Sequence, residues 1–255
     1  MTAVVAWPWL SAAGAVVGLL FGLFGVGGSS FATPLLSLLG VPGLMAVASA
    51  LPATIPAALA GAYAYGRKGE IDRTTAKWSV LGGFPATILG ALLSNVVGGS
   101  ALLVASGVVL GLVGLRVLRP LSEDQQHAGA ARRARPGLVV AGAAGVGLFT
   151  GLLANGGGFL LVPLFVVGLG LGIRSAAGTN LIVISALAVP TLVAHWALGH
   201  IDWTVAAAFA AGAVPAAFLG SRLAQRLASE SLRLAFGWLL VGFAAYFIVR
   251  QLLAW

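Results

Sequence analysis

Two glycine-rich stretches of the same pattern are the places where this chain could bind a ligand. The first is Gly22-Leu-Phe-Gly-Val-Gly-Gly-Ser-Ser-Phe-Ala-Thr-Pro34, and the second is Gly151-Leu-Leu-Ala-Asn-Gly-Gly-Gly-Phe-Leu-Leu-Val-Pro163. The glycines that they share, and the closing proline, are separated by 129 positions. Because each glycine inside a helix costs about 1 kcal/mol relative to alanine, two clusters in matching positions predict two broken helices.

A broken helix offers chemistry that suits an anion. The free N–H groups at the start of a half-helix have a partial positive charge and accept a negatively charged group, and glycine lets the backbone approach closely. Close helix packing alone is the alternative explanation, but three consecutive glycines beside an asparagine favour ligand binding. The candidate substrate-binding residues are Gly27, Gly28, Ser29, Ser30, Thr33, Asn155, Gly156, Gly157 and Gly158.

Three further polar residues lie at the entrance to the helices that follow these stretches. Ser49 belongs to the first half of the chain, and Thr179 and Asn180 to the second. They are candidate substrate ligands. For the hydroxyl residues, a hydrogen bond to the carbonyl of the preceding helical turn is an equally good explanation.

His195 is the one ionisable side chain well inside an apolar segment. An ionisable residue at such a position suggests function, and a histidine could transfer a coupling proton. Its place beside Trp196, near a segment end, also suits an interfacial belt. The apolar segments contain no Asp or Glu and the chain has no cysteine. We therefore expect no enzyme, no catalytic residue, no metal site and no cofactor.

The composition places the elements that hold these residues in a membrane. Hydrophobic residues make up 60% of the chain, charged residues 8%, and the mean hydropathy is +1.04. Whole windows of 18 or more residues without charge are typical of membrane-spanning helices. The net charge of +8 comes from short loops between apolar segments, which indicates membrane orientation and not a nucleic-acid surface.

The chain divides into two similar halves. We expect a first transmembrane repeat over 1–118, a polar linker loop over 119–136 and a second repeat over 137–255. The correspondence continues beyond the glycine motif, since Gly69-Glu-Ile-Asp72 matches Gly199-His-Ile-Asp202 and Gly82, Pro85 and Gly90 match Gly212, Pro215 and Gly220. Such a nearly gap-free series indicates an internal duplication.

The positions of Lys and Arg indicate that the halves are inverted. If each half crosses the membrane an odd number of times, every Lys and Arg except Arg250 lies on one side. Basic loops favour the cytoplasm, so loops 66–77 and 119–136 are predicted to be cytoplasmic and both termini outside. The short segments 29–41 and 158–172 either cross the membrane or form re-entrant hairpins. In both cases each half crosses the membrane an odd number of times.

The doubled motif, each copy followed by a small-residue element such as Gly178-Thr-Asn-Leu181, resembles the TauE/SafE family of membrane permeases. The likeness covers nearly the whole chain, although the first half has Ser29 at the third glycine and Ala48-Ser-Ala-Leu51 in the second element. The resemblance implies export of sulfite or of sulfur-containing organic anions across the cell (cytoplasmic) membrane of a prokaryote.

The expected fold is therefore an all-α polytopic membrane protein with two inverted-topology repeats and paired broken or re-entrant helices. The expected function is secondary transport of a small anion by alternating access around a midplane site between the two glycine-rich segments. An anion channel that uses the same segments as a filter is the alternative. The expected partners are a small anionic substrate and the lipid bilayer, without nucleic acid; a homo-oligomer stays open.

Overall fold

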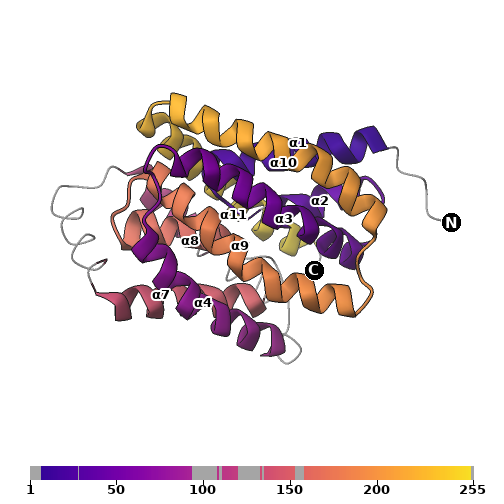
Figure 1. Cartoon of the computed structure of the whole chain (residues 1–255), viewed down its shortest axis with the longest axis horizontal. Coiled ribbons are helices and arrows are strands. Elements are labelled where there is room, and N and C mark those ends of the chain that lie inside the picture. Colours follow the sequence, from indigo (N-terminus) through magenta and orange to yellow (C-terminus); the bar gives the residue numbers. More distant parts are fainter. Residues whose placement is uncertain are drawn as a thin grey trace.

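The computed structural model describes residues 7–27, 29–93, 108, 111–119, 133, 135–152 and 158–253. Every regular element in those ranges is a helix (Figure 1), which confirms the all-α prediction for this part of the chain. In chain order the helices are α1 (Trp7–Phe24), α2 (Ser29–Leu38), α3 (Gly43–Gly66), α4 (Arg73–Leu93), α7 (Pro136–Leu152), α8 (Gly158–Pro163), the π-helix η1 (Leu164–Gly168), α9 (Ile173–Ala197), α10 (Trp203–Arg226) and α11 (Ser229–Leu253).

Several of these helices have the length and composition of membrane spans. Among the described residues, four apolar helices are long enough to cross a membrane: Trp7–Phe24, Met45–Gly66, Ile173–Ala197 and Trp203–Arg226. At about 1.5 Å per residue, a helix of 20 residues matches a hydrocarbon core of about 30 Å. Large apolar side chains on the outer faces of the helices are exposed, including Leu59, Leu81, Val193 and Leu219, as expected for a surface covered by lipid.

Helices α1 and α10 pack side by side along a seam of glycines. A Cβ placed on Gly18 would lie 2.2 Å from the carbonyl oxygen of Ala213, and one on Gly212 would lie 1.9 Å from that of Ser11. Only glycine permits such a close approach of two backbones. Since residue numbers rise together along the seam, as the pairs Ser11–Gly212 and Gly22–Ala217 show, the two helices are parallel.

Helices α4 and α7 form a second parallel pair with the same kind of seam. A Cβ on Gly82 would lie 2.4 Å from Val140 O, and one on Gly90 would lie 2.2 Å from Leu148 O. Figure 1 shows that α4 and α7 run in the direction opposite to α1 and α10. The structure therefore contains two parallel pairs of opposite direction.

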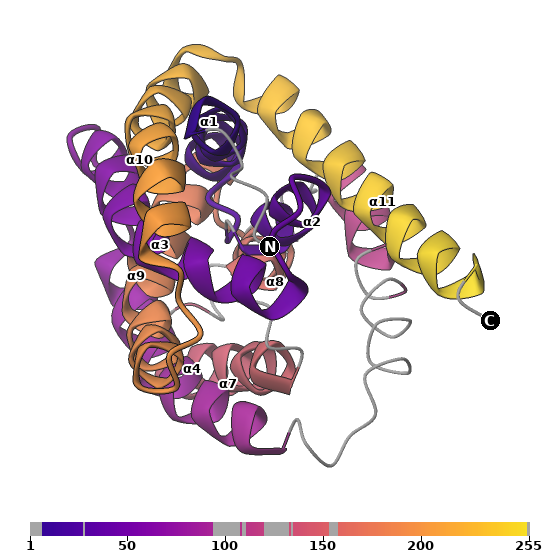
Figure 2. The ribbon, with the colours of Figure 1, turned by 90° about the vertical axis from the view of Figure 1, so that its right-hand side faces the viewer.

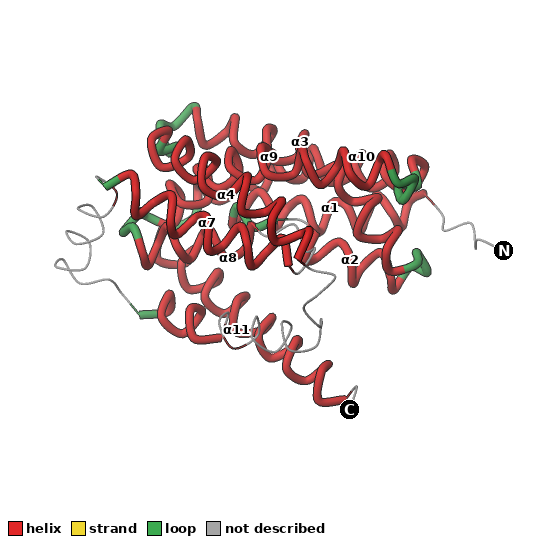
Figure 3. The backbone as a smooth tube through the Cα atoms, turned by 90° about the horizontal axis from the view of Figure 1, so that it is seen from below, coloured by secondary structure: helices red, strands yellow, loops and turns green. Residues whose placement is uncertain are grey.

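Helices α3 and α9 connect the two pairs. They contact each other near Gly61, where Leu181 packs, and near Gly178, where Tyr65 packs, so they are antiparallel. Figure 2 looks along the helices and shows α2 and α8 inside an arc formed by α10, α3, α9 and α4. The interior position of these short helices agrees with the burial of Leu36 in α2 and Leu161 in α8. Figure 3 shows α11 leaving the bundle obliquely.

Basic side chains gather at one end of the bundle, which we call the basic end. Arg133 pairs with Asp72 at 3.8 Å, and Arg174 donates to the carbonyl oxygens of Ala224 and Leu227 at the end of α10. A cation at a helix C-terminus is favourable. These contacts bring the α3–α4 loop, the start of α9 and the end of α10 to the same end.

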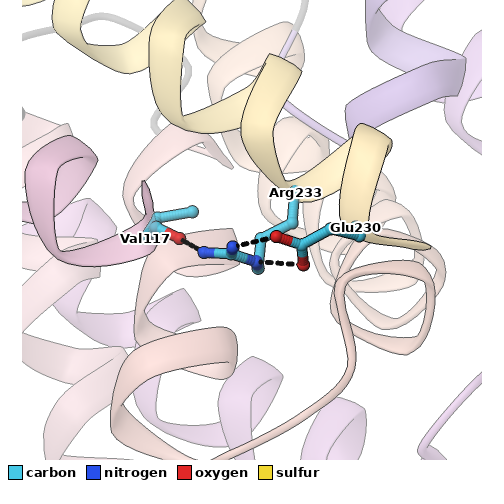
Figure 4. Close-up of polar contacts among 3 residues, drawn as sticks. All are labelled: Val117, Glu230 and Arg233. Atoms are coloured by element: carbon cyan, nitrogen blue, oxygen red, sulfur yellow. Dashed lines mark hydrogen bonds and ion pairs between the residues drawn. The ribbon is translucent and has the colours of Figure 1, made fainter. Parts of the chain in front are cut away.

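Arg233 belongs to the same basic end. It donates to the carbonyl oxygen of Val117, in the helical stretch 111–118, and binds both carboxylate oxygens of Glu230 (Figure 4). The hydrogen bonds from Arg233 hold the pKa of the Glu230 carboxyl below its ordinary value. The Glu230 carboxylate therefore stays ionised at neutral pH and keeps Arg233 in position between α11 and the 111–118 stretch.

The opposite end of the bundle is marked by tryptophans, and we call it the Trp end. The exposed side chains of Trp7, Trp9, Trp196 and Trp203 lie near the ends of the helices that meet there. Ser11 Oγ donates to Ala208 O at 2.8 Å, which brings the start of α1 to the start of α10. Tryptophans at span ends suit a membrane interface.

Equivalent elements of the two halves begin at matching positions. Helices α1 and α7, and α2 and α8, start 129 positions apart; α3 and α9, and α4 and α10, start 130 apart. Turn glycines with positive φ match as well, since Gly69 (71°) corresponds to Gly199 (68°). Asp72 and Asp202 each accept a backbone N–H in the first turn of the helix that follows, so both are N-caps.

Candidate functional site

The first glycine-rich stretch is the place where α1 ends. The helix stops at Phe24, residues 25–27 are not helical, and α2 begins at Ser29. Gly25 has a φ of +66°, and a Cβ on it would lie 2.5 Å from Ala177 O, so both conformation and space require glycine there. Gly27 is buried.

The other candidates of this stretch are only partly described. Gly28 lies outside the described residues, and Ser29 and Ser30 are described as backbone of α2 alone. Thr33 is half-buried on α2. Their role in substrate binding stays a prediction.

The second stretch lies between the end of α7 at Leu152 and the start of α8 at Gly158. Asn155, Gly156 and Gly157 lie outside the described residues. Gly158 is the first residue of α8, at the position that corresponds to Ser29, the first residue of α2. The proposed ligand role of these four residues therefore also stays a prediction.

Helix α2 runs back toward the end where α1 begins. The C-terminal end of α1 touches Tyr65, near the C-terminal end of α3, whereas α2 ends a few residues before the N-terminal end of α3. Helix α2 must therefore reverse the direction of α1. With 10 residues, it is about 15 Å long, half of a hydrocarbon core.

The element Gly178-Thr-Asn-Leu181 fits against the end of α1 and the α3–α4 loop. A Cβ on Gly178 would lie 2.8 Å from Tyr65 Cβ and 2.9 Å from Glu70 O, so glycine is required. Thr179 Oγ1 accepts a hydrogen bond from Asp72 N at 2.9 Å, and Asn180 Nδ2 donates to Gly25 O at 2.8 Å. Of the predicted site residues, Asn180 is thus placed directly beside the first glycine-rich stretch.

Ser49 lies at the other end of the bundle. Its hydroxyl accepts a hydrogen bond from Asp202 N at 2.9 Å, which is the counterpart of the bond between Thr179 and Asp72. Ser49 and Thr179 are both fully buried. Each fixes the loop before a capped helix, one at the Trp end and one at the basic end, so the structure does not bring these two candidates together.

Tyr65 is a residue of this site that the sequence did not point to. Its side chain is fully buried, and its hydroxyl lies 3.0 Å from both Gly22 O and Leu23 O. An aromatic residue near the end of an apolar segment is typical of an interfacial belt, which hides any specific contact. The spacing to the glycine motif gives no signal for this pairing either.

His195 lies near the Trp end and faces a second histidine. Its Nδ1 atom is 3.3 Å from Nδ1 of His200, and the ring centroids are 5.4 Å apart. This partner could not be predicted from the sequence. Within the described ranges, no group of three or more metal-binding side chains occurs.

The chain is similar in sequence to proteins named as membrane transporters. The family model described as "Sulfite exporter TauE/SafE" matches residues 10–247. A "Probable membrane transporter protein" of Xylella fastidiosa (strain 9a5c) is 30% identical over 93% of both chains. The "Probable membrane transporter protein YjnA" of Bacillus subtilis is 25% identical over 86% of this chain and 91% of its own. No solved structure matches this chain significantly.

Proposed function

The chain belongs to the TauE/SafE family, which makes it a membrane transporter and not an enzyme, and we propose that it moves a small anion. Sulfite, or a sulfur-containing organic anion of the sulfonate type, is the substrate that the family description favours. The observation on which the proposal rests is the pair of corresponding glycine-rich stretches that separate α1 from α2 and α7 from α8.

The mechanism that we infer is alternating access between two inverted repeats. The opposite directions of the α1/α10 and α4/α7 pairs, and the matching helix starts, support the inverted arrangement. In secondary transporters of this kind, discontinuous helices near the membrane midplane hold the substrate, and one helix bundle moves against the other. The return of α2 after α1 supports a re-entrant path for the first glycine-rich segment.

The proposed anion site uses backbone N–H groups and not a basic side chain. Three of the described arginines have other partners: Arg133 pairs with Asp72, Arg174 donates to carbonyls at the end of α10, and Arg233 pairs with Glu230. All three lie at the basic end. Weak binding by helix dipoles suits a carrier, which must release its substrate as readily as it binds it.

We place the basic end in the cytoplasm and the Trp end outside. This orientation follows the preference of Lys and Arg for cytoplasmic loops and puts both termini outside. It also makes loops 66–77 and 119–136 cytoplasmic.

Transport into proteoliposomes tests the proposal. We expect the purified protein to take up [35S]sulfite with saturation and to exchange it for unlabelled sulfite from the other side. Asn155→Ala and Gly157→Leu should abolish uptake while membrane insertion is unchanged, and Gly172→Ala, at an exposed position with nothing within 4 Å, should leave it intact.

The outcomes distinguish a carrier from a channel, and both from a protein in which the proposed site has no role. Single-channel currents without counterflow would favour the alternative, an anion channel. Saturating uptake of another anion from a panel of thiosulfate, sulfonates and carboxylates would keep the carrier and change the substrate. Full uptake by Asn155→Ala and Gly157→Leu would reject the proposed site.

A further inference from the structure

Tyr65 places a hydroxyl group where packing alone needs none. The side chain is fully buried between α3, the end of α1 and Gly178, and a phenylalanine would fill the same space. The hydroxyl has one proton and lies 3.0 Å from two carbonyl oxygens, those of Gly22 and Leu23. A buried tyrosine hydroxyl with backbone partners is part of how the surrounding segment is held.

Asn180 completes the same arrangement from the other half of the chain. Its Nδ2 donates to Gly25 O, while the carbonyl oxygens of Gly22 and Leu23 share the single proton of the Tyr65 hydroxyl. Carbonyls at the end of a helix without such partners have a partial negative charge. This charge would lie next to the segment that the proposed function assigns to an anion.

We propose that Tyr65 and Asn180 are positioning residues that make the Gly25–Gly27 segment selective for a negatively charged solute. By hydrogen bonding the last carbonyls of α1, they reduce the negative potential beside the segment and fix its backbone. This inference rests on the proposed function, because it assumes that an anion binds at the segment. Neither residue needs to touch the solute.

The repeat offers a comparison at the corresponding positions. The counterpart of Tyr65, 130 positions later, is His195, and the counterpart of Asn180, 130 positions earlier, is Ala50. His195 faces His200, and alanine has no donor in its side chain. Both donors thus act on the first segment, one from each half of the chain, and their removal should act there.

Tyr65→Phe tests the proposal, with Tyr63→Phe as its matched control. Tyr63 lies two positions before Tyr65 on α3, on the opposite side of the helix. Its side chain is exposed and contacts the ring of Phe218. The readout is [35S]sulfite uptake into proteoliposomes over a range of concentrations. We expect Tyr65→Phe to raise KM about tenfold, as for one buried hydrogen bond lost, with the maximal rate within about twofold of wild type. Tyr63→Phe should leave both unchanged.

Asn180→Leu removes the second donor at similar size and gives an independent measurement. We expect the same increase in KM, which keeps the proposal testable if Tyr65→Phe does not purify as a monodisperse protein. Wild-type KM in a folded Tyr65→Phe or Asn180→Leu protein overturns the proposal, as does a fall in maximal rate with KM unchanged. If the wild-type protein takes up no anion at all, the proposed function fails instead.

Discussion

At the residue scale, the contact between His195 and His200 restricts where protons can bind. Their Nδ1 atoms are 3.3 Å apart, so one ring has to donate a proton and the other has to accept it. A proton added to the donor ring leaves this bond in place, whereas protonation of both Nδ1 atoms removes the acceptor. A proton can pass along this contact from one ring to the other, which suits a proton-coupled step.

We predict that His195→Gln abolishes the accumulation of sulfite driven by a pH gradient in proteoliposomes. Exchange of sulfite at equal pH should persist, since it needs no net proton movement. His127→Gln, the same change in the polar linker 119–136, is the control and should accumulate sulfite like the wild type.

Gradient-driven accumulation by His195→Gln at the wild-type level would exclude a coupling role. The pair would then be a hydrogen bond that closes the α9–α10 turn, where His200 N also donates to His195 O at 3.0 Å.

At the scale of elements, the glycine seams decide which positions tolerate a side chain. On α7, Gly147 and Gly145 are two residues apart and differ in surroundings. A Cβ on Gly147 would lie 2.6 Å from Gly83 O, whereas a Cβ on Gly145 would meet nothing within 4 Å. The same substitution at the two sites should therefore act in opposite directions.

We predict that Gly147→Ala lowers the free energy of unfolding by about 1–3 kcal/mol, because the α4 backbone has to move away. Gly145→Ala should raise it by about 0.4–1 kcal/mol, because alanine restricts the unfolded chain and clashes with nothing. Thermal unfolding of both variants in the same detergent measures the difference. Equal unfolding midpoints for the two variants would show that α4 and α7 pack less closely than described here.

Much of the element scale could be predicted from the sequence. The doubled glycine motif predicted interruptions near Gly27 and Gly157; residues 25–27 are not helical, whereas residues 153–157 lie outside the described ranges, so the second interruption stays a prediction. Asp72 and Asp202 stand directly before apolar segments, where helix N-caps are common, and both cap the helix that follows. These features depend on local composition, which is what a sequence pattern records.

The contacts that hold the site could not be predicted in the same way. Asn180 was a candidate for substrate binding, but its bond to Gly25 spans 155 positions and depends on how α9 meets the end of α1. The bonds from Asp72 to Thr179 and from Asp202 to Ser49 span 107 and 153 positions. A single sequence contains no information on such long-range pairings when the residues involved are common polar ones.

At the scale of the whole molecule, the orientation in the membrane can be measured directly because the chain has no cysteine. We predict that Lys68→Cys, at the basic end, is protected from a membrane-impermeant maleimide in intact cells. Leu198→Cys, in the turn at the Trp end, should react. Both positions are exposed, so access to the reagent depends on the side of the membrane.

Lysed cells supply the control, in which both cysteines should react. Labelling of Lys68→Cys and protection of Leu198→Cys in intact cells would reverse the orientation proposed for the basic end.

The two glycine seams also limit how the molecule can change shape. Backbones that lie against each other with no room for a methyl group cannot slide without losing contacts along the whole seam. Each parallel pair, α1 with α10 and α4 with α7, should therefore travel as one rigid block. The α3–α9 contact, which includes flexible side chains such as Leu181 against Gly61, is the natural hinge between them. A cross-link between α1 and α10, or between α4 and α7, would then leave the transport rate unchanged. A cross-link between α3 and α9 would stop transport.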